Sequence, residues 1–180
     1  MTSKQNNFEQ LHMNPSVSII MGSTSDLPVM KKAADYLDGM QIPFEMLALS
    51  AHRTPEEVAD FAKNAAARGV KVIIAGAGMS AALPGVIAAI TPLPVIGVPL
   101  SATLQGEDAL LSVAQMPPGI PVAATGIDGA MNAAVLATRI IALTDKDVAD
   151  RYNTWRDGLG KKIVKANQDL KEIKYDFKVN

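Results

Sequence analysis

The side chains best suited to acid–base chemistry lie in one short segment, SAHRTP at residues 50–55. His52 is one of two histidines in the chain, and the other, His12, lies in a polar stretch near the N-terminus. An imidazole transfers protons near neutral pH, and a guanidinium such as that of Arg53 binds phosphate. His52 could instead cap a helix or be satisfied within the core, and Arg53 could be a simple surface charge. Their position side by side favours proton transfer on an anionic substrate.

A second polar segment, GSTSD at residues 22–26, follows an apolar run and opens a helical pattern. Its glycine permits close approach of the backbone, and the amides and hydroxyls at a helix start suit phosphate binding. Asp26 can accept hydrogen bonds from sugar hydroxyls. The alternative is that Ser25 or Asp26 only caps the helix, and the segment alone does not decide between the two. One acid–base group beside an anion site, with no nucleophile, indicates isomerisation, proton shuttling or decarboxylation-type chemistry.

A third segment, GAGMSA at residues 76–81, loosely matches the dinucleotide fingerprint G-x-G-x-x-A. A NAD site also needs an acidic residue about 20 positions further on, and the corresponding residues 97–100 read GVPL. We therefore reject a NAD site and predict a glycine-rich loop whose backbone approaches a small ligand. The expected contacts of this ligand are Gly78, Met79 and Ser80, together with Ser50 of the first segment.

The three segments follow apolar runs that are typical of strands covered on both faces. Five such runs occur, at residues 17–21, 44–49, 70–75, 94–98 and 121–125. Helical patterns alternate with them, at residues 26–39, 55–68, 81–90, 108–115 and 129–143, and a further helix is expected at 145–158. The alternation predicts an α/β fold, a three-layer αβα sandwich around a flavodoxin-like, doubly wound parallel sheet. Polar segments then meet at the carboxyl edge of the sheet, where ligands bind.

The composition excludes several classes of protein. The net charge is −1, from 17 basic and 18 acidic residues, so nothing electrostatic favours nucleic acid or an anionic membrane as a partner. The absence of cysteine excludes disulfides, thiolate catalysis and cysteine metal sites, and allows a reducing compartment; we expect a cytoplasmic protein. The uncharged stretch 72–106 is cut by glycine and proline into pieces too short for a membrane helix.

The length of 180 residues fits one domain with a single core. We expect a flexible N-terminal tail at 1–16, one catalytic domain at 17–158 and a C-terminal tail at 159–180. The helices at 81–90 and 129–143 carry almost no charge, and a helix that is apolar on all sides must be covered. These helices therefore predict a homo-oligomer packed through them, and the C-terminal tail is a further surface that could dock on a neighbour.

Six motifs in one collinear order together resemble the PurE family, the N5-carboxyaminoimidazole ribonucleotide mutases of purine biosynthesis. They are GSTSD at 22–26, SAHRTP at 50–55, AGAG and ALPG within 75–85, PLPVIGVPL at 92–100, LLSVAQMPPGIPVA at 110–123 and GAMNAAVLA at 129–137. The similarity covers about residues 16–157. No single motif is decisive, but six in register are very specific.

The resemblance implies a flavodoxin-like subunit in a homo-octamer, and an isomerase that needs neither a metal nor an organic cofactor. The carboxylate of N5-carboxyaminoimidazole ribonucleotide would move from the exocyclic nitrogen to ring carbon C4, giving 4-carboxy-5-aminoimidazole ribonucleotide on the way to IMP. CO2 would be released, kept in the pocket and recaptured, and by motif match His52 would then remove the C4 proton. Ser23, Ser25 and Arg53 match the phosphate-binding positions, and Asp26 matches the ribose-binding position.

The glycine-rich loop departs from the mutase pattern. The mutases read GAGGAAHLPG where this chain reads GAGMSAALPG, so Met79 and Ala82 replace a glycine and a second histidine. Loops of this AGM type resemble the carboxylase branch, which uses free CO2, whereas the block at 110–123 resembles the mutases. We predict the mutase and keep two alternatives, a phosphoribosylaminoimidazole carboxylase and a non-enzymatic flavodoxin-like nucleotide-binding module. If His52 is the only imidazole in the site, it must act as both acid and base.

Overall fold

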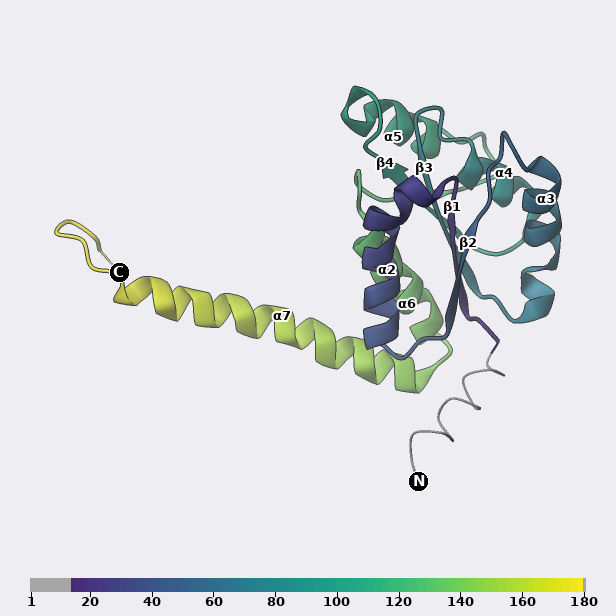
Figure 1. Ribbon diagram of the computed structural model, residues 1–180. Helices are drawn as coiled ribbons and strands as arrows, with labels where there is room; N and C mark the ends of the chain where they lie inside the picture. The colour runs from purple at the N-terminus through teal and green to yellow at the C-terminus, as the bar shows by residue number, and fades with distance from the viewer. Residues whose placement is uncertain (1–13, 180) are drawn as a thin grey trace.

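Five parallel strands form a sheet in the computed structural model, which describes residues 14–179 (Figure 1). The strands are β1 (Val17–Met21), β2 (Phe44–Ala48), β3 (Val72–Gly78), β4 (Val95–Leu100) and β5 (Ala123–Ala124). Their order, β2-β1-β3-β4-β5, is the flavodoxin-like order. The predicted α/β class and doubly wound parallel sheet are therefore confirmed. His12 and most of the N-terminal tail expected at 1–16 lie outside the described residues.

The three central strands are apolar except for Ser18 of β1, because both of their faces are covered. Every residue of β1 and β4 is buried, as is all of β3 except its last residue, Gly78. Parallel pairing sets Ile74 between Ile19 on one neighbouring strand and Ile96 on the other. The edge strand β2 is only partly buried, and it carries the one carboxylate in the sheet, Glu45. Because every pairing in the sheet is parallel, the carboxyl ends of all the strands lie at one edge.

Glu45 ties the edge strand to the rest of the sheet. Its carboxylate accepts two hydrogen bonds from the Arg68 guanidinium, at 2.8 and 2.7 Å, and a third from the Ser18 hydroxyl at 2.6 Å. Burial raises the pKa of Glu45, but the hydrogen bonds from Arg68 and Ser18 together outweigh burial and leave the pKa below its usual value. The contact also satisfies Ser18, a fully buried polar side chain of β1.

Helices cover both faces of the sheet (Figure 1). One face carries α2 (Leu27–Gly39) and α6 (Ala130–Ala142), and the other carries α3 (Pro55–Asn64), α4 (Leu83–Ile90) and α5 (Glu107–Ala114). Each layer buries its own apolar cluster, because successive strand residues such as Ile73 and Ile74 point to opposite faces. Among residues 14–179, no helix combines the length and apolar character needed to cross a membrane.

Helix α6, whose one charged residue is Arg139, is covered in large part by the chain itself. It packs between α2 and α7 (Lys146–Glu172), and its Ala133, Ala137 and Ile141 are buried there. Part of the apolar surface that predicted a second subunit is thus covered by the chain itself. The remainder includes Met131, which is 43% exposed on the first turn of α6.

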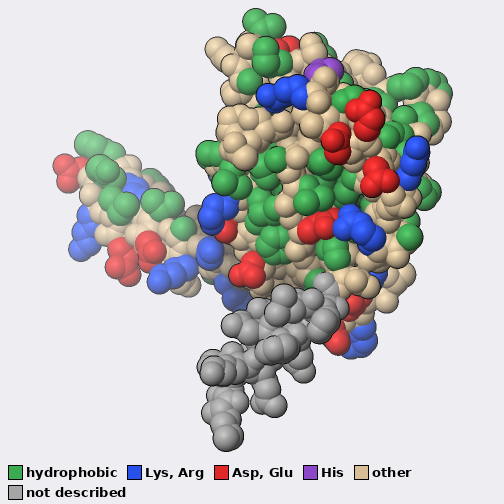
Figure 2. Space-filling view, turned by 45° about the vertical axis from the view of Figure 1, so that its right-hand side comes forward, with side chains coloured by type: hydrophobic (Ala, Val, Ile, Leu, Met, Phe, Trp, Pro, Cys, Tyr) green, Lys and Arg blue, Asp and Glu red, His purple; other side chains and the backbone are tan. Residues whose placement is uncertain are grey.

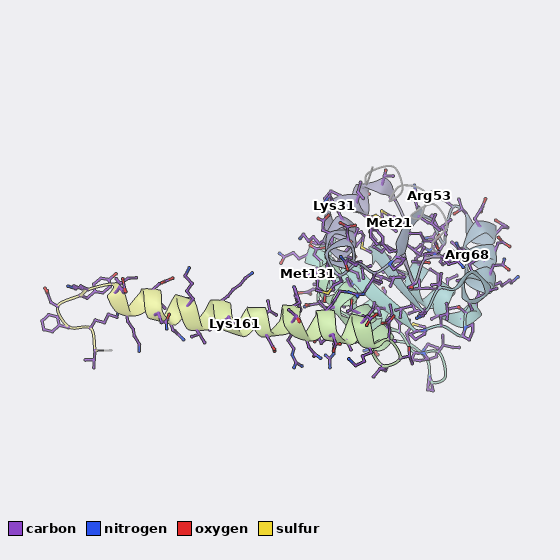
Figure 3. The ribbon with its side chains drawn as sticks, turned by 90° about the horizontal axis from the view of Figure 1, so that it is seen from below. Met21, Lys31, Arg53, Arg68, Met131 and Lys161 are labelled. Atoms are coloured by element: carbon purple, nitrogen blue, oxygen red, sulfur yellow. The ribbon has the colours of Figure 1, made fainter. Side chains whose placement is uncertain are left out.

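The last helix is much longer than its predicted range of 145–158. It continues to Glu172, and neither Gly158 nor Gly160 ends it. Its first half packs against the domain through Trp155, which joins the apolar cluster beneath α2 and α6. Its second half, marked by Lys161, extends away from the domain (Figures 1 and 3). The chain therefore presents a long helical arm that the sequence pattern did not predict.

Candidate active site

The loops that follow β1, β2 and β3 line one cavity of about 500 Å³ at the carboxyl edge of the sheet. A cavity of this size suits a small ligand. The structure places all the residues predicted for the site on its wall: His52, Ser23, Ser25, Asp26, Ser50, Arg53, Gly78, Met79 and Ser80. Residues from three segments far apart in the sequence therefore share one cavity. Their individual roles toward a ligand remain predictions.

The loop after β1 is held by a capping box at the start of a short 3-10 helix, Thr24–Asp26. The Ser23 hydroxyl accepts a hydrogen bond from the Ser25 amide at 3.3 Å, and the Asp26 carboxylate accepts one from the Ser23 amide at 3.1 Å. The Ser25 hydroxyl also donates to Asp26, at 3.4 Å. Capping is thus present, but the cap residue is Ser23 and not the Ser25 or Asp26 of the alternative interpretation; Asp26 precedes α2 without a side-chain cap bond. The capping box also fixes exposed hydroxyls at a helix start, where an anion can bind.

The loop after β2 closes on itself before α3 begins. The Thr54 amide donates to the Ser50 carbonyl at 2.8 Å, and the Ser50 amide donates to the Thr54 hydroxyl at 3.0 Å. Pro55 then starts the helix, where its missing N–H costs no hydrogen bond. This closed loop presents His52 at its exposed tip, on the wall of the cavity.

Arg53 connects the loops after β1 and β2. Its Nη2 donates to the carbonyl of Gly22 at 3.2 Å, and its Nε donates to the Ser50 hydroxyl at 3.4 Å. A guanidinium has five N–H donors, so these two contacts leave others for an anion. Figure 2 shows a histidine beside a basic side chain at the top of the molecule, and both His52 and Arg53 are exposed. Acid–base and anion-binding groups thus stand together at the cavity.

The end of β3 needs glycine because other groups approach it closely. A Cβ at Gly76 would lie 2.4 Å from the Met30 sulfur, and a Cβ at Gly78 would lie 3.0 Å from the Cβ of Ala102. The predicted close approach of backbone at this loop is thus explained partly by packing. Beyond Gly78 the chain turns tightly, with the Ala81 amide donating to the Met79 carbonyl at 2.8 Å, and α4 follows.

Apolar residues complete the wall, and none of them was predicted for the site from the sequence. They are Gly22, Ala51, Ala77, Ala81, Ala82, Leu83 and Ala102. Alanine side chains carry no chemical signal of a site. The position of Ala102 could have indicated the site, because this residue lies two residues after β4 at the same edge of the sheet. The cavity is therefore polar on the side of β1 and β2 and, apart from Ser80, apolar on the side of β3 and β4.

This arrangement suits proton transfer on an anionic ligand whose other end is apolar. The residues from 14 to 179 bring no three histidine, aspartate or glutamate side chains close enough to hold a metal ion. The groups available for chemistry at the cavity are the His52 imidazole, the Asp26 carboxylate, the Arg53 guanidinium and several hydroxyls and amides. Of these, only the imidazole both donates and accepts a proton near neutral pH.

Comparisons with known proteins agree with the resemblance drawn from the six motifs. Residues 16–162 match the family described as AIR carboxylase. An N5-carboxyaminoimidazole ribonucleotide mutase of Pyrococcus abyssi is 54% identical over 146 residues, which are 81% of this chain and 84% of that relative. A phosphoribosylaminoimidazole carboxylase of Schizosaccharomyces pombe is 46% identical over 161 residues, 89% of this chain but only 29% of that longer protein.

A solved structure extends the likeness to three dimensions. The crystal structure of Treponema denticola PurE2-S38D is 34% identical to this chain, with a TM-score of 0.81. The alignment covers 89% of this chain and 100% of that one. The similarity therefore extends over nearly the whole of the fold described above.

Proposed function

Because the chain belongs to the AIR carboxylase family, we propose that it is an isomerase that converts N5-carboxyaminoimidazole ribonucleotide to 4-carboxy-5-aminoimidazole ribonucleotide. The observation that carries this proposal is one cavity lined by His52, by Arg53 and by the hydroxyls of the loop after β1. The name and the 54% identity of the Pyrococcus abyssi relative support the same activity. The product belongs to purine biosynthesis, and we place the protein in the cytoplasm.

The polar side of the cavity binds the ribonucleotide. The phosphate accepts hydrogen bonds from Arg53, from the Ser23 hydroxyl and from the Ser25 hydroxyl, which turns away from Asp26 to reach it. Asp26 then accepts from the ribose hydroxyls. Ser50 holds the Nε of Arg53, so it positions the guanidinium as well as lining the cavity. The loop of Gly78, Met79 and Ser80 faces the base.

His52 carries the one proton that the reaction has to move. Breaking the bond between the exocyclic nitrogen and the carboxylate releases CO2, and the nitrogen gains a proton. Forming the new bond between C4 and CO2 costs C4 its proton, so no net proton is gained or lost. A protonated His52 can give its proton to the nitrogen and then take the C4 proton, acting as acid and then as base. No second imidazole is required for this balance.

A carboxylase that takes free CO2 is the second candidate. It is favoured by the AGM-type loop containing Met79 and by the carboxylase name of the Schizosaccharomyces pombe relative. The two activities separate in one experiment, in which the purified protein receives either N5-carboxyaminoimidazole ribonucleotide or aminoimidazole ribonucleotide with bicarbonate. We expect rapid turnover of the first. Turnover of aminoimidazole ribonucleotide with bicarbonate alone would refute the mutase activity and establish the carboxylase activity.

We also propose that the protein works as a homo-octamer. On α4, Val86, Ala88 and Ile90 remain partly exposed, and the apolar residues of α6 include the exposed Met131. The arm of α7 and the residues after it expose more apolar side chains: Leu159, Ile163, Val164, Leu170, Ile173, Tyr175 and Phe177. Exposed apolar surface of this extent is typical of subunit interfaces. The catalytic domain at 17–158 would then assemble with help from the tail at 159–180.

A further inference from the structure

Met79 has a backbone conformation that its residue type disfavours. Its φ is +56°, in the left-handed region where a side chain is strained and glycine is not. Five non-glycine residues within 14–179 have a positive φ: Gln41, Met79, Leu104, Gln105 and Asp128. Met79 is the one among them that lines the cavity. Strain of this kind persists where the surrounding structure imposes it, and it gathers at functional sites.

The packing of the core does not account for the methionine. Its side chain is 57% exposed, and it belongs to neither apolar cluster of the domain, whereas the neighbouring Ala77 and Ala81 are buried. The turn that holds its backbone is closed by main-chain hydrogen bonds at the Met79 and Ser80 carbonyls, which any residue could accept. The fold of the single chain therefore gains little from a methionine here, whereas the side chain lies on the wall of the site.

The residues of the cavity wall indicate that the Met79 side chain can cover a bound ligand. Apart from Met79 and the exposed Ser80, the wall on the side of β3 and β4 consists of Gly78, the small Ala77, Ala81, Ala82 and Ala102, and the buried Leu83. Met79 is the one large, exposed apolar side chain on the wall. Methionine is unbranched and flexible, so it adapts its shape to a ligand and buries itself against it.

We propose that Met79 is a positioning residue that folds over the imidazole ring of the substrate and keeps released CO2 in the cavity. The proposal rests on the mutase function, in which CO2 leaves the exocyclic nitrogen and must reach C4 before it escapes. An apolar cover excludes water from this step and repels neither the ring nor CO2. Burial of the methionine side chain on ligand binding also offsets the strain of its backbone.

The test follows a carbon label through the reaction. The protein receives unlabelled N5-carboxyaminoimidazole ribonucleotide in a solution of ¹³C-bicarbonate and carbonic anhydrase, and early product is analysed by mass spectrometry. A sample without protein corrects for spontaneous loss of CO2. The variants are Met79→Gly, which removes the cover, and the matched control Met79→Leu, which keeps an apolar side chain of similar volume. Thermal unfolding is measured in parallel.

Full burial of a methionine side chain shifts an equilibrium by about tenfold or more, so M79G should raise the labelled fraction of product by about tenfold. KM should rise with it, and both the labelled fraction and KM should change much less in M79L than in M79G, because leucine keeps an apolar cover. The Tm of M79G should be unchanged or higher, because glycine adopts the positive φ without strain; a purely structural residue would lose stability instead.

The possible outcomes distinguish failure of the role proposed for Met79 from failure of the mutase function. A wild-type protein that turns over with little label in its product supports the mutase. If M79G then behaves as the wild type does in labelling and in KM, the role of Met79 is overturned and the mutase stands. Complete labelling of the wild-type product, or no turnover, overturns the mutase and the role of Met79 with it.

Discussion

Replacement of Arg53 by alanine should weaken substrate binding far more than it slows the chemical step. The guanidinium contacts the protein through only two long hydrogen bonds, to the Gly22 carbonyl at 3.2 Å and the Ser50 hydroxyl at 3.4 Å. Arg53 is also exposed, so its loss should cost the fold little. In the proposed complex its remaining N–H groups bind the substrate phosphate, which is equally charged in the ground state and the transition state.

The size of the effect follows from the type of hydrogen bond. A hydrogen bond to a charged group contributes about 1.5–3 kcal/mol, and exposure of the site favours the lower half of that range. At about 1.4 kcal/mol for each tenfold change, Arg53→Ala should raise KM by about 10- to 30-fold. Because the contact is uniform binding, kcat should change by less than about threefold.

Steady-state kinetics of Arg53→Ala and Arg53→Lys on the ribonucleotide measure this split between KM and kcat. The lysine variant keeps the charge and loses the forked geometry, so its KM should fall between those of the alanine variant and the wild type. The same enzymes are then compared on the ribonucleoside that lacks the phosphate. The penalty of R53A should disappear there. An unchanged KM on the ribonucleotide, or an equal penalty on the ribonucleoside, would refute phosphate binding by Arg53.

Two further predictions concern the fold and the assembly. Because the pKa of Glu45 is lowered in the folded protein, its contribution is present above the unfolded pKa of about 4.3 and is lost as the pH falls through the folded value. Urea unfolding of Glu45→Gln should therefore show a loss of about 1 kcal/mol at pH 7 that vanishes in acid, and an equal loss at both pH values would contradict this. Native mass spectrometry should give eight times the chain mass of 19.0 kDa, and Ile163→Asp combined with Leu170→Asp should lower that number if the arm helps assembly. An octamer unaffected by the double variant would remove the arm from the interface.

The sheet and the site loops could be predicted because their signals are local. Buried parallel strands leave continuous apolar runs, and β1 was predicted at its exact bounds. The polar segments after these strands had to meet, since all carboxyl ends of a parallel sheet lie at one edge. That rule was enough to place His52 of one loop and Ser23 of another on the same cavity.

The features that were missed depend on surroundings that the sequence does not display. Glycine often ends a helix by taking the left-handed conformation, but Gly158 and Gly160 remain helical in α7, in open space. The positive φ of Met79 contradicts the preference of its residue type and follows from the turn between β3 and α4. Ala102 lines the cavity through its position alone. In each case the backbone geometry, and not the residue type, decides the outcome.

The central claim is that one imidazole, that of His52, moves the proton of the reaction. Its most direct test is the kcat of His52→Asn on N5-carboxyaminoimidazole ribonucleotide, measured as formation of 4-carboxy-5-aminoimidazole ribonucleotide. Loss of a general acid–base group should lower kcat by about 10²- to 10⁴-fold, while the circular dichroism and Tm of the exposed site variant stay close to those of the wild type. A folded H52N variant with a kcat near that of the wild type would contradict the claim.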